Sequence, residues 1–297
     1  MRATLALLCA LAATGCAGER SLGGEAGRPP HRPADQRHFE VAAMTYNVRY
    51  GSARDGPDSW PLRRELALDV LRRRAPDVVG MQEVLAFQRA EFLAACPGYA
   101  AVGVGREADG SGEACPIFYR SGRFALVASG TFWLSATPDL PGSRGWDASL
   151  PRVCTWALFE ERGGGRFQVF NVHFDHLGAT ARLESARLVA ARIAVRRPAH
   201  PALLLGDLNA GEDSEPVRAL HGLVDTFRAL HPDSTEVGTF HGFRGGTDGA
   251  KIDFVLATPA VGVLGAEIVR DEDGGRFPSD HYPVAARVLI PVGTKGD

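Results

Sequence analysis

Short apolar runs that end in polar residues constrain the fold of this chain more than any other feature. The runs MTYN, VVGMQE, VFNVHFD and LLLGDLN each join aliphatic or β-branched residues to an amide, an acid or a histidine. Longer segments with helical periodicity lie between several of these runs, at 60–74, 86–96 and 180–197. This alternation predicts an α/β protein with buried strands, whose polar side chains gather where the strands end.

The order of the expected elements predicts two packed sheets. We expect strands at 39–48, 76–84, 99–105, 115–120, 124–134, 152–161, 167–174, 201–209, 251–258, 262–270 and 282–290. Two strand-rich halves, each with a helical segment, satisfy the layer rule if the sheets pack face to face with helices outside. The chain has 297 residues, 45% of them hydrophobic, and no linker after residue 38, so we expect one domain over 39–292. In the helix at 60–74, Leu62, Leu66, Leu68 and Val70 are expected to face the core.

The first 38 residues read as a targeting segment and a tether. Arg2 precedes an apolar run, Ala3 to Ala13, which is shorter than the roughly 20 residues of a transmembrane helix. The run ends in TGC, which resembles a lipoprotein lipobox, so residues 1–16 are expected to be a signal peptide with lipidated Cys16. The alternative is an ordinary cleaved signal. Residues 17–38, rich in Gly, Pro and charge, are expected to be a flexible tether.

We therefore expect an exported, membrane-anchored bacterial protein that faces the periplasm or cell exterior. We expect a monomer, although the sequence does not fix the oligomeric state.

The cysteines give no sign of a metal site. Cys96, Cys115 and Cys154 remain after the signal segment, an odd number without metal-ligand spacing. Cys115 and Cys154 lie in strand-like runs and are expected in the core. Whether two of the three form a disulfide is open.

The polar residues at the strand ends form a chemically consistent set. They are Asn47, Glu83, His173, Asp175, Asp207, Asn209, Asp253, Asp280 and His281. Each of them alone is commonly a turn residue or a solvated side chain. Together they supply carboxylates, amides and two histidines, with no candidate Cys or Ser nucleophile. Oxygen ligands favour Mg²⁺, Mn²⁺ or Ca²⁺ over zinc, and histidines can move protons. The set therefore predicts metal-assisted hydrolysis of a phosphate ester.

The motifs TYNVRY, QEV, NVHFDH, GDLN, KIDFV and SDHYP occur in this order between about residues 40 and 290. This ordered set resembles the endonuclease/exonuclease/phosphatase superfamily. The resemblance implies a four-layer α/β/β/α sandwich of two mixed β-sheets flanked by helices, and a divalent cation, Mg²⁺ or else Mn²⁺ or Ca²⁺.

The resemblance also implies a role for each matched residue. Glu83 would be the principal metal ligand, with Asn47 beside it and Asp280 near the metal. Asp207 would orient or deprotonate the attacking water, and Asn209 would hold a phosphate oxygen. His281 would contact the phosphate and be oriented by Asp253. His173 matches the branches of the superfamily that carry a histidine there.

Three further predictions concern the substrate and the second histidine. The long loop at 132–152 is expected to line the cleft, with Arg152 on phosphate. Asp175 and His241 are also expected to contact substrate, with Arg244 an alternative to His241. Glu113 is expected to orient His173, because deoxyribonuclease-like branches of the superfamily carry a Glu at this point.

Three functions remain open at this level. The first is hydrolysis of a small or lipid-linked phosphomonoester or phosphodiester. The second is an extracytoplasmic nuclease, which the net charge of −2 disfavours because duplex binding gains from a basic surface. The third is a non-catalytic surface-binding lipoprotein on the same fold.

Overall fold

The structure is a computed structural model that describes residues 37–195 and 200–293. The expected signal peptide, Cys16 and the tether up to residue 36 lie outside the described residues. His38, which was expected to end the tether, is already the first residue of a strand. None of the helices in the described part of the chain is both long and apolar enough to span a lipid bilayer.

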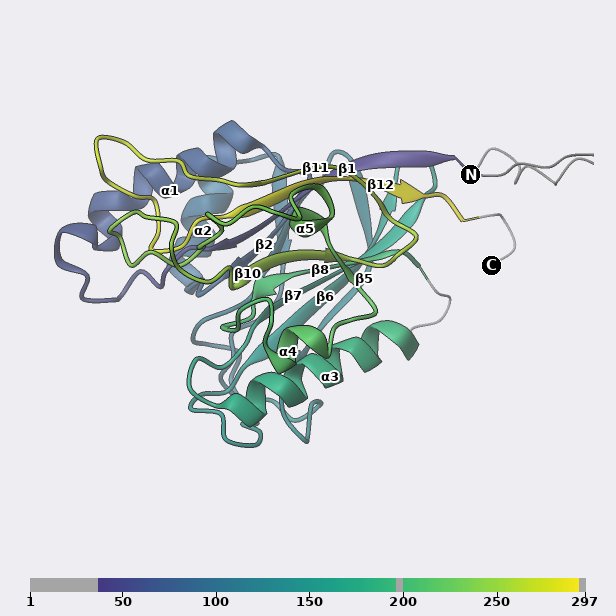
Figure 1. Cartoon of the computed structure of the whole chain (residues 1–297), viewed down its shortest axis with the longest axis horizontal. Coiled ribbons are helices and arrows are strands. Elements are labelled where there is room, and N and C mark those ends of the chain that lie inside the picture. Colours follow the sequence, from purple (N-terminus) through teal and green to yellow (C-terminus); the bar gives the residue numbers. More distant parts are fainter. Residues whose placement is uncertain (1–36, 196–199, 294–297) are drawn as a thin grey trace, which may run out of the picture. The chain divides into compact units, whose positions relative to one another are not determined.

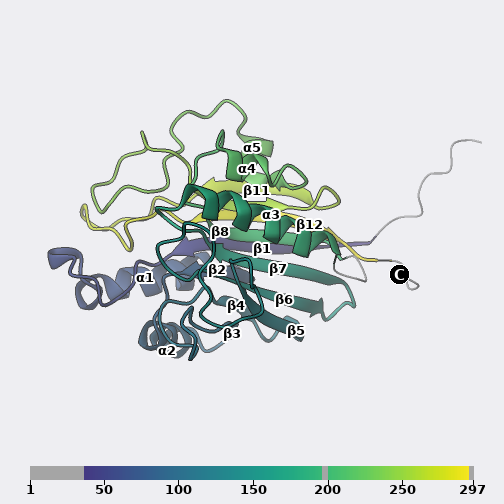
Figure 2. The same cartoon turned by 90° about the horizontal axis from the view of Figure 1, so that it is seen from below.

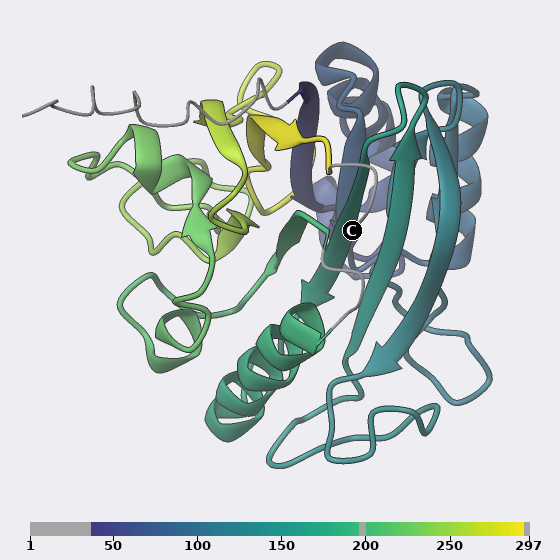
Figure 3. The same cartoon turned by 90° about the vertical axis from the view of Figure 1, so that its right-hand side faces the viewer.

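The first sheet has six strands around a central parallel pair. Its members are β1 (His38–Asn47), β2 (Val78–Gln82), β3 (Tyr99–Val102), β4 (Ile117–Arg120), β11 (Gly262–Ile268) and β12 (Val284–Pro291). They lie in the order β11-β12-β1-β2-β4-β3. Strands β1 and β2 run parallel, and the other neighbours are antiparallel. The first and last strands of the described chain, purple β1 and yellow β12, therefore lie side by side (Figure 3).

The second sheet repeats this plan with a different set of strands. Its members are β5 (Phe124–Trp133), β6 (Val153–Glu161), β7 (Arg166–His173), β8 (Ala202–Asp207), β9 (Val224–Asp225) and β10 (Asp253–Ala257). They lie in the order β5-β6-β7-β8-β10-β9, and the first three are seen side by side in Figure 2. Only the central pair, β7 and β8, is parallel.

Helices cover the outer faces of both sheets. Helices α1 (Trp60–Arg74) and α2 (Ala86–Ala95) pack on the first sheet, and α3 (Ala179–Val195) and α4 (Glu215–Arg218) pack on the second (Figure 1). A short α5 (Thr226–Leu230) lies against β10 and β11, and a 3₁₀ turn, η1 (Gly56–Asp58), precedes α1. Between the sheets, aromatic rings such as Phe159 and Phe167 pack with Val288 and Ile290. The expected α/β/β/α sandwich of two mixed sheets is confirmed.

The buried face of α1 differs from the expected one. Leu62 is 57% exposed, whereas Arg63 is only 1% exposed and lies among the core residues Ala67, Leu68 and Leu71. A guanidinium is tolerated there because its N–H groups reach backbone carbonyls outside the helix.

All three cysteines in the described residues, Cys96, Cys115 and Cys154, are buried, and no disulfide joins any two of them. Cys115 and Cys154 lie in apolar clusters, as expected.

The topology brings the polar strand ends to one edge of the sandwich. Parallel strands β1 and β2 end at the same edge, and so do β7 and β8. Because β12 is antiparallel to β1, and β10 to β8, the first residues of β10 and β12 lie at that edge too. In the second sheet the register sets Asp207 opposite both His173 and Asp253.

Candidate active site

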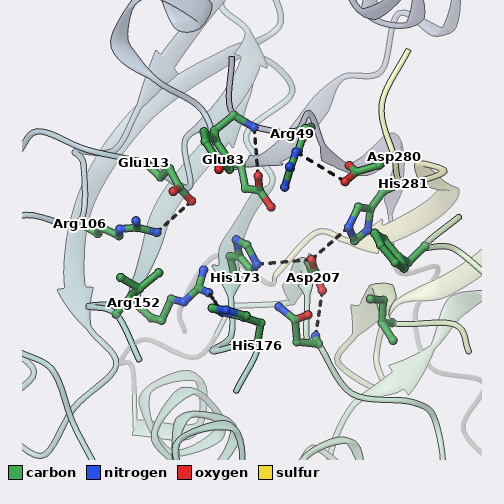
Figure 4. A pocket seen from close by; sticks show the side chains of 15 residues that line it. Arg49, Glu83, Arg106, Glu113, Arg152, His173, His176, Asp207, Asp280 and His281 are labelled. Carbon is green, nitrogen blue, oxygen red and sulfur yellow. Dashed lines mark hydrogen bonds and ion pairs between the residues drawn. The ribbon is translucent and has the colours of Figure 1, made fainter. Parts of the chain in front are cut away.

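A cleft of about 630 Å³ opens at this edge of the sandwich. Its walls come from both sheets and their loops. Lining residues include Arg49, Tyr50, Glu83, Arg106, Glu113, Arg152, His173, His176, Asp207, Asn209, Phe240, Asp280 and His281 (Figure 4). Most strand-end residues expected to carry function therefore share one cavity. Asn47, Asp175, Asp253 and His241 do not line it, and their contacts are described below.

Glu83 follows the end of β2 and faces the cleft in a fixed pose. Its Oε2 accepts a hydrogen bond from the Tyr50 backbone N–H (3.0 Å), and its Oε1 accepts one from Asn47 Nδ2 (3.1 Å). Its φ of 62° is unusual for a residue with a Cβ, as are the φ values of Arg49 (55°) and Asn209 (46°). Positions of this kind cost about 1–3 kcal/mol each and persist where the surrounding structure holds them.

Asn47, at the end of β1, connects the two sheets. Its Nδ2 donates to Glu83 and also to Asp207 Oδ2 (3.0 Å), while its Oδ1 accepts from the Arg49 backbone N–H (3.0 Å). In this arrangement Asn47 presents a donor to both acids rather than a ligand oxygen. Its assignment as a metal ligand stays a prediction.

Asp207 lies at the centre of the site and is 1% exposed. Its Oδ1 accepts from the Asn209 backbone N–H (2.8 Å), and its Oδ2 lies 3.5 Å from His173 Nε2 and 3.8 Å from His281 Nε2. Burial, assisted by the negative charge of Asp253, raises the pKa of Asp207 to about 7. A carboxyl group with such a pKa can exchange protons near neutral pH.

His281 and Asp253 form the contact that the motifs predicted. His281 Nδ1 donates to Asp253 Oδ2 at 2.9 Å, both side chains are buried, and the ring of Phe240 packs on the imidazole at 5.0 Å. Burial alone would lower the pKa of His281, but Asp253 and Asp207 hold it well above its ordinary value. The imidazolium then presents Nε2–H to the cleft, as a donor suited to a phosphate oxygen.

His173, at the end of β7, has the opposite electrostatic surroundings. Burial lowers its pKa well below the ordinary value, and the positive charge of Arg152 lowers it further. Both effects favour the neutral form of His173, whose Nε2 lies 3.5 Å from Asp207 Oδ2.

Asp280 brings a further carboxylate to the cleft, beside an arginine. Its Oδ2 lies 3.8 Å from Arg49 Nε, and Arg49 is itself held by Asp55 at 2.8 Å. Burial raises the pKa of Asp280, His281 opposes the rise, and the charge of Glu83 adds to it. Glu83 and Asp280 are thus close enough to repel each other.

The donor set fits a hard divalent cation. The raised pKa values of Asp207 and Asp280 show acids crowded together in a buried place, and a cation would relieve that repulsion. Among the described residues, Asp207, Asp253 and His281 place one potential ligand atom each within 4.8 Å of the others. The Oδ1 atom of Asp253 is buried and has no hydrogen-bond partner in the described part of the chain, which also fits an ion. Glu83 and Asp280 offer a second position, which does not require breaking the His281–Asp253 bond.

Glu113 does not pair with His173 as expected. Its Oε2 lies 2.9 Å from Arg106 Nη1, and no hydrogen bond joins Glu113 to His173 within the described residues. Arg106 was not expected in the site. Arg106 comes from the Gly-rich loop before β4. Its guanidinium is permanently charged, so it is a stronger partner for the Glu113 carboxylate than the imidazole of His173.

The expected substrate contacts of Asp175 and His241 are not supported. Asp175 is 1% exposed, and its oxygens accept hydrogen bonds from Ser149, Leu150, Leu177 and Gly178. His241 stacks on Tyr282 at 4.0 Å, and burial lowers its pKa to about 4. Both residues hold loops near the cleft instead. Arg244, the alternative to His241, does not line the cleft either, whereas Arg152 lines it as expected.

A buried polar layer beneath the cleft also escaped the sequence reasoning. Gln82 Nε2 donates to Asn171 Oδ1 across the two sheets (2.7 Å) and to Thr45 Oγ1 (3.0 Å), and Asn171 donates to the Met81 and Pro116 carbonyls. Both amides belong to motifs of the sequence. Gln82 lies one residue before Glu83 in QEV, and Asn171 lies two residues before His173 in NVHFDH, so their places in these motifs could have indicated a role at the site.

The fold and the site define a class: a two-sheet sandwich with an acid- and histidine-lined cleft at the strand ends. Residues 44–281 match the Endonuclease/Exonuclease/phosphatase family, and the chain belongs to that family.

Similar proteins include solved structures that match almost end to end. An endonuclease/exonuclease/phosphatase from Bacteroides vulgatus is 34% identical, with a TM-score of 0.78 over 85% of this chain and 99% of the other. A mannosyl-6-phosphatase from Bacteroides thetaiotaomicron is 34% identical, with a TM-score of 0.76 over 84% of this chain and 99% of the other. An uncharacterized protein of Acanthamoeba polyphaga mimivirus is 31% identical over 130 residues, 39% of this chain. That match covers 46% of the viral protein, so the chain spans less than half of this relative's length.

Proposed function

We propose that this protein is a divalent-metal-dependent phosphomonoesterase that removes the phosphate group from a phosphorylated sugar. The observation that carries the proposal is the meeting of His281, Asp207, Asn209, Glu83 and Asp280 in one cleft. These residues come from both sheets, and none of the described cleft residues is a candidate serine or cysteine nucleophile. Water is therefore the nucleophile that the site is suited to activate.

The protein's own groups divide the work as follows. His281, held by Asp253, donates Nε2–H to a phosphoryl oxygen. Asp207, with a pKa of about 7, accepts a proton from the attacking water as its oxygen bonds to phosphorus. The bond from phosphorus to the sugar oxygen breaks, that oxygen takes a proton from a second water molecule in the cleft, and the sugar leaves as an alcohol. Glu83 and Asp280 would hold the cation, whose chemistry is to neutralise charge on the phosphoryl oxygens.

The sugar phosphate is favoured over nucleic acid by two observations. One is the similarity, over most of both chains, to a protein described as a mannosyl-6-phosphatase. The other is the net charge of −2, since nucleic-acid binding relies on many basic contacts to phosphates.

The test is phosphate release by the full chain after EDTA treatment and return of Mg²⁺ or Mn²⁺. The panel contains mannose 6-phosphate, other hexose 6-phosphates, bis-p-nitrophenyl phosphate and duplex DNA. We expect release from hexose phosphates only with the cation, and little turnover of the diesters. Faster cleavage of DNA or the diester would replace the proposal with a nuclease or phosphodiesterase. A protein inactive on the whole panel with either cation would contradict an enzymatic role.

A further inference from the structure

The cleft has a second wall that the proposed chemistry does not use. It consists of Arg106, Glu113, Arg152 and His176, and we call it the distal wall. Arg106 and Glu113 come from the loop between β3 and β4, Arg152 directly precedes β6, and His176 follows β7. Figure 4 shows these four side chains together on the side of the cleft away from Asp280 and His281.

The charges on the distal wall are balanced. Arg106 Nη1 lies 2.9 Å from Glu113 Oε2, and Arg152 Nε lies 3.5 Å from the buried Asp175 Oδ2. Each guanidinium therefore has its own carboxylate. A second anionic group on a substrate would meet the Glu113 carboxylate as well as the arginines. The wall thus suits an uncharged polar group better than another phosphate.

The wall offers both hydrogen-bond acceptors and donors. The Oε1 atom of Glu113 has no partner among the described residues, and its side chain lines the cleft. Arg152 Nη2 lies 3.0 Å from His176 Nδ1, and a guanidinium can only donate, so Nδ1 accepts. The proton of a neutral His176 is therefore on Nε2, which makes Nε2 a donor. A hydroxyl group, which donates and accepts at once, matches such a mixed surface.

Hydrogen bonds hold the distal wall in place before any ligand arrives. Trp133 Nε1 donates to the Arg106 carbonyl (2.6 Å), and the Arg106 backbone N–H donates to the Glu113 carbonyl (3.0 Å). Asp175, directly before His176, accepts hydrogen bonds from Ser149 Oγ (2.7 Å), three residues before Arg152, and from the Gly178 N–H (2.7 Å), two residues after His176. Preorganisation of this kind lowers the entropy lost on binding.

We propose that the distal wall binds the adjacent hydroxyl groups of the sugar whose phosphate is held by His281 and the acids. A guanidinium beside a carboxylate presents donors and an acceptor side by side, which fits two neighbouring hydroxyls. The assignment rests on the proposed function, because it names the part of the substrate that does not react. It makes Glu113 and His176 specificity residues.

The experiment compares mannose 6-phosphate with cyclohexylmethyl phosphate, which has the same primary phosphate ester on a ring without hydroxyls. We expect the wild-type kcat/KM for the sugar phosphate to exceed that for the analogue about 10- to 100-fold. Glu113→Gln and His176→Ala should each reduce this ratio about tenfold. His176 is exposed, so its substitution should leave folding intact. Thermal unfolding checks both variants.

Glu107→Gln is the matched control. Glu107 also contacts Arg106 (3.4 Å), but its side chain is 46% exposed and does not line the cleft. Its ratio should equal that of the wild type.

Four outcomes would overturn the assignment. Equal losses for both substrates in Glu113→Gln would mean a role in the reaction itself. Equal wild-type kcat/KM values for the two substrates would mean that the distal wall does not bind hydroxyl groups, while the proposed phosphatase activity would stand. If neither substrate were hydrolysed, both the proposed phosphatase activity and the sugar-binding role of the distal wall would be contradicted. 6-Phosphogluconate carries a second anionic group, a carboxylate. If the protein preferred it to mannose 6-phosphate, and Glu113→Gln increased that preference, the distal wall would be an anion site, which would also overturn the assignment.

Discussion

At the scale of single residues, the two histidines of the cleft are prepared for opposite tasks. His281 is charged because Asp253, Asp207 and Asp280 surround it, although burial opposes its protonation. His173 is neutral because burial and Arg152 both disfavour its protonated form. The same side chain thus becomes a permanent donor in one place and a potential acceptor a few ångströms away. Asp207 contacts both rings and is the residue through which they are coupled.

The first prediction concerns the cation and Glu83. Glu83→Gln keeps the size of the side chain and one acceptor oxygen, which can still accept one of the two hydrogen bonds from Tyr50 and Asn47. It removes the negative charge that attracts the ion. Loss of a residue that only supports a metal ligand typically costs about 10- to 100-fold in metal affinity, so we expect a loss of about 100-fold or more in Mn²⁺ affinity when the ligand itself changes. Isothermal titration calorimetry on EDTA-treated protein measures it, with exposed Glu65→Gln as control. Unchanged Mn²⁺ binding, or hydrolysis that survives EDTA, would contradict the role of Glu83.

The sequence predicted most of the acids, amides and histidines of the cleft, since each follows or precedes an apolar run. It also predicted the pairing of His281 with Asp253, but not the partner of Glu113. Glu113 was expected beside His173, but Arg106, seven residues earlier in a Gly-rich loop, occupies it. The fold of a loop depends on contacts with distant residues, here the Trp133 indole, which no local pattern records. Arg49 and His176 also lie in motif segments, yet their orientation depends on Asp55 and Arg152.

At the scale of elements, Arg63 ties α1 to two loops of the site. It is buried, and its guanidinium donates to the carbonyls of Val48, Arg49, Asp58 and Pro278. Val48 and Arg49 follow Asn47, and Pro278 precedes Asp280. One side chain therefore sets the spacing between the segments that carry Glu83's partner Tyr50 and the Asp280 carboxylate. A leucine at this helix position could supply packing but none of these bonds.

The second prediction is that Arg63→Lys destabilises the protein and weakens the cation site without touching it. An ammonium has three donors and cannot reach four carbonyls, so we expect a loss of roughly 2–3 kcal/mol in the free energy of unfolding. Mn²⁺ affinity should fall several-fold, because Asp280 is less well held. Urea unfolding and calorimetry measure the two effects, with Arg64→Lys as control, at the neighbouring position whose side chain is 43% exposed. A variant as stable as Arg64→Lys would show that the four bonds contribute little.

The third prediction concerns the loop anchored by Asp175. Burial alone would raise the pKa of Asp175, but hydrogen bonds from Gly178, Ser149 and Leu177 outweigh it and place the pKa well below the ordinary value. A lowered folded-state pKa contributes stability above the unfolded value of about 3.9, and this contribution is lost as the pH falls through the folded value. Asp175→Asn should therefore cost roughly 2 kcal/mol at pH 7 and progressively less below about pH 4.

Urea midpoints of wild type and variant, measured in parallel from pH 7 to pH 2.5, test this. Titration of other acids affects both proteins and cancels in the difference. A difference that stays constant down to the lowest pH would mean that the carboxylate charge is not what holds the loop.

Elements were predicted best where they are long and periodic. The helix at 60–74 has the bounds of α1, and β5, β6 and β7 differ from the expected strands by a residue at one or both ends. The pieces not expected, α4, α5 and β9, have only two to five residues each. Such pieces depend on tertiary contacts, as with Thr226, whose hydroxyl donates to the Val255 carbonyl of β10. The buried face of α1 was misjudged for the same reason, because only distant carbonyls make a buried Arg63 acceptable.

At the scale of the whole molecule, two similar sheets explain why residues far apart in the sequence converge. Each sheet has a parallel central pair, β1 with β2 and β7 with β8, and all four strands end at the cleft. The strands that return, β10 and β12, begin there. The chemistry therefore depends on strand direction and order, which are global properties. The motif order along the chain allowed this arrangement to be predicted, whereas periodicity alone supports only two packed layers.

The fourth prediction concerns attachment of the molecule to a membrane. We propose that the chain is tethered through lipidated Cys16, a residue outside the described part of the structure, on the basis of the sequence LAATGC and the Gly- and Pro-rich stretch that follows it. Acyl chains add about 0.8 kcal/mol per buried CH₂, so several chains on one residue would hold the protein firmly on a bilayer.

The full chain and its Cys16→Ser variant are expressed in a bacterium, and membrane and soluble fractions are separated. We expect the wild type in the membrane fraction, extractable only by detergent and labelled by a fatty-acid analogue, and the variant unlabelled. Cys9→Ser, a change of the same kind within the apolar run, should label like the wild type. Equal solubility of wild type and Cys16→Ser, with no label on either, would leave an ordinary cleaved signal as the explanation of the N-terminal sequence.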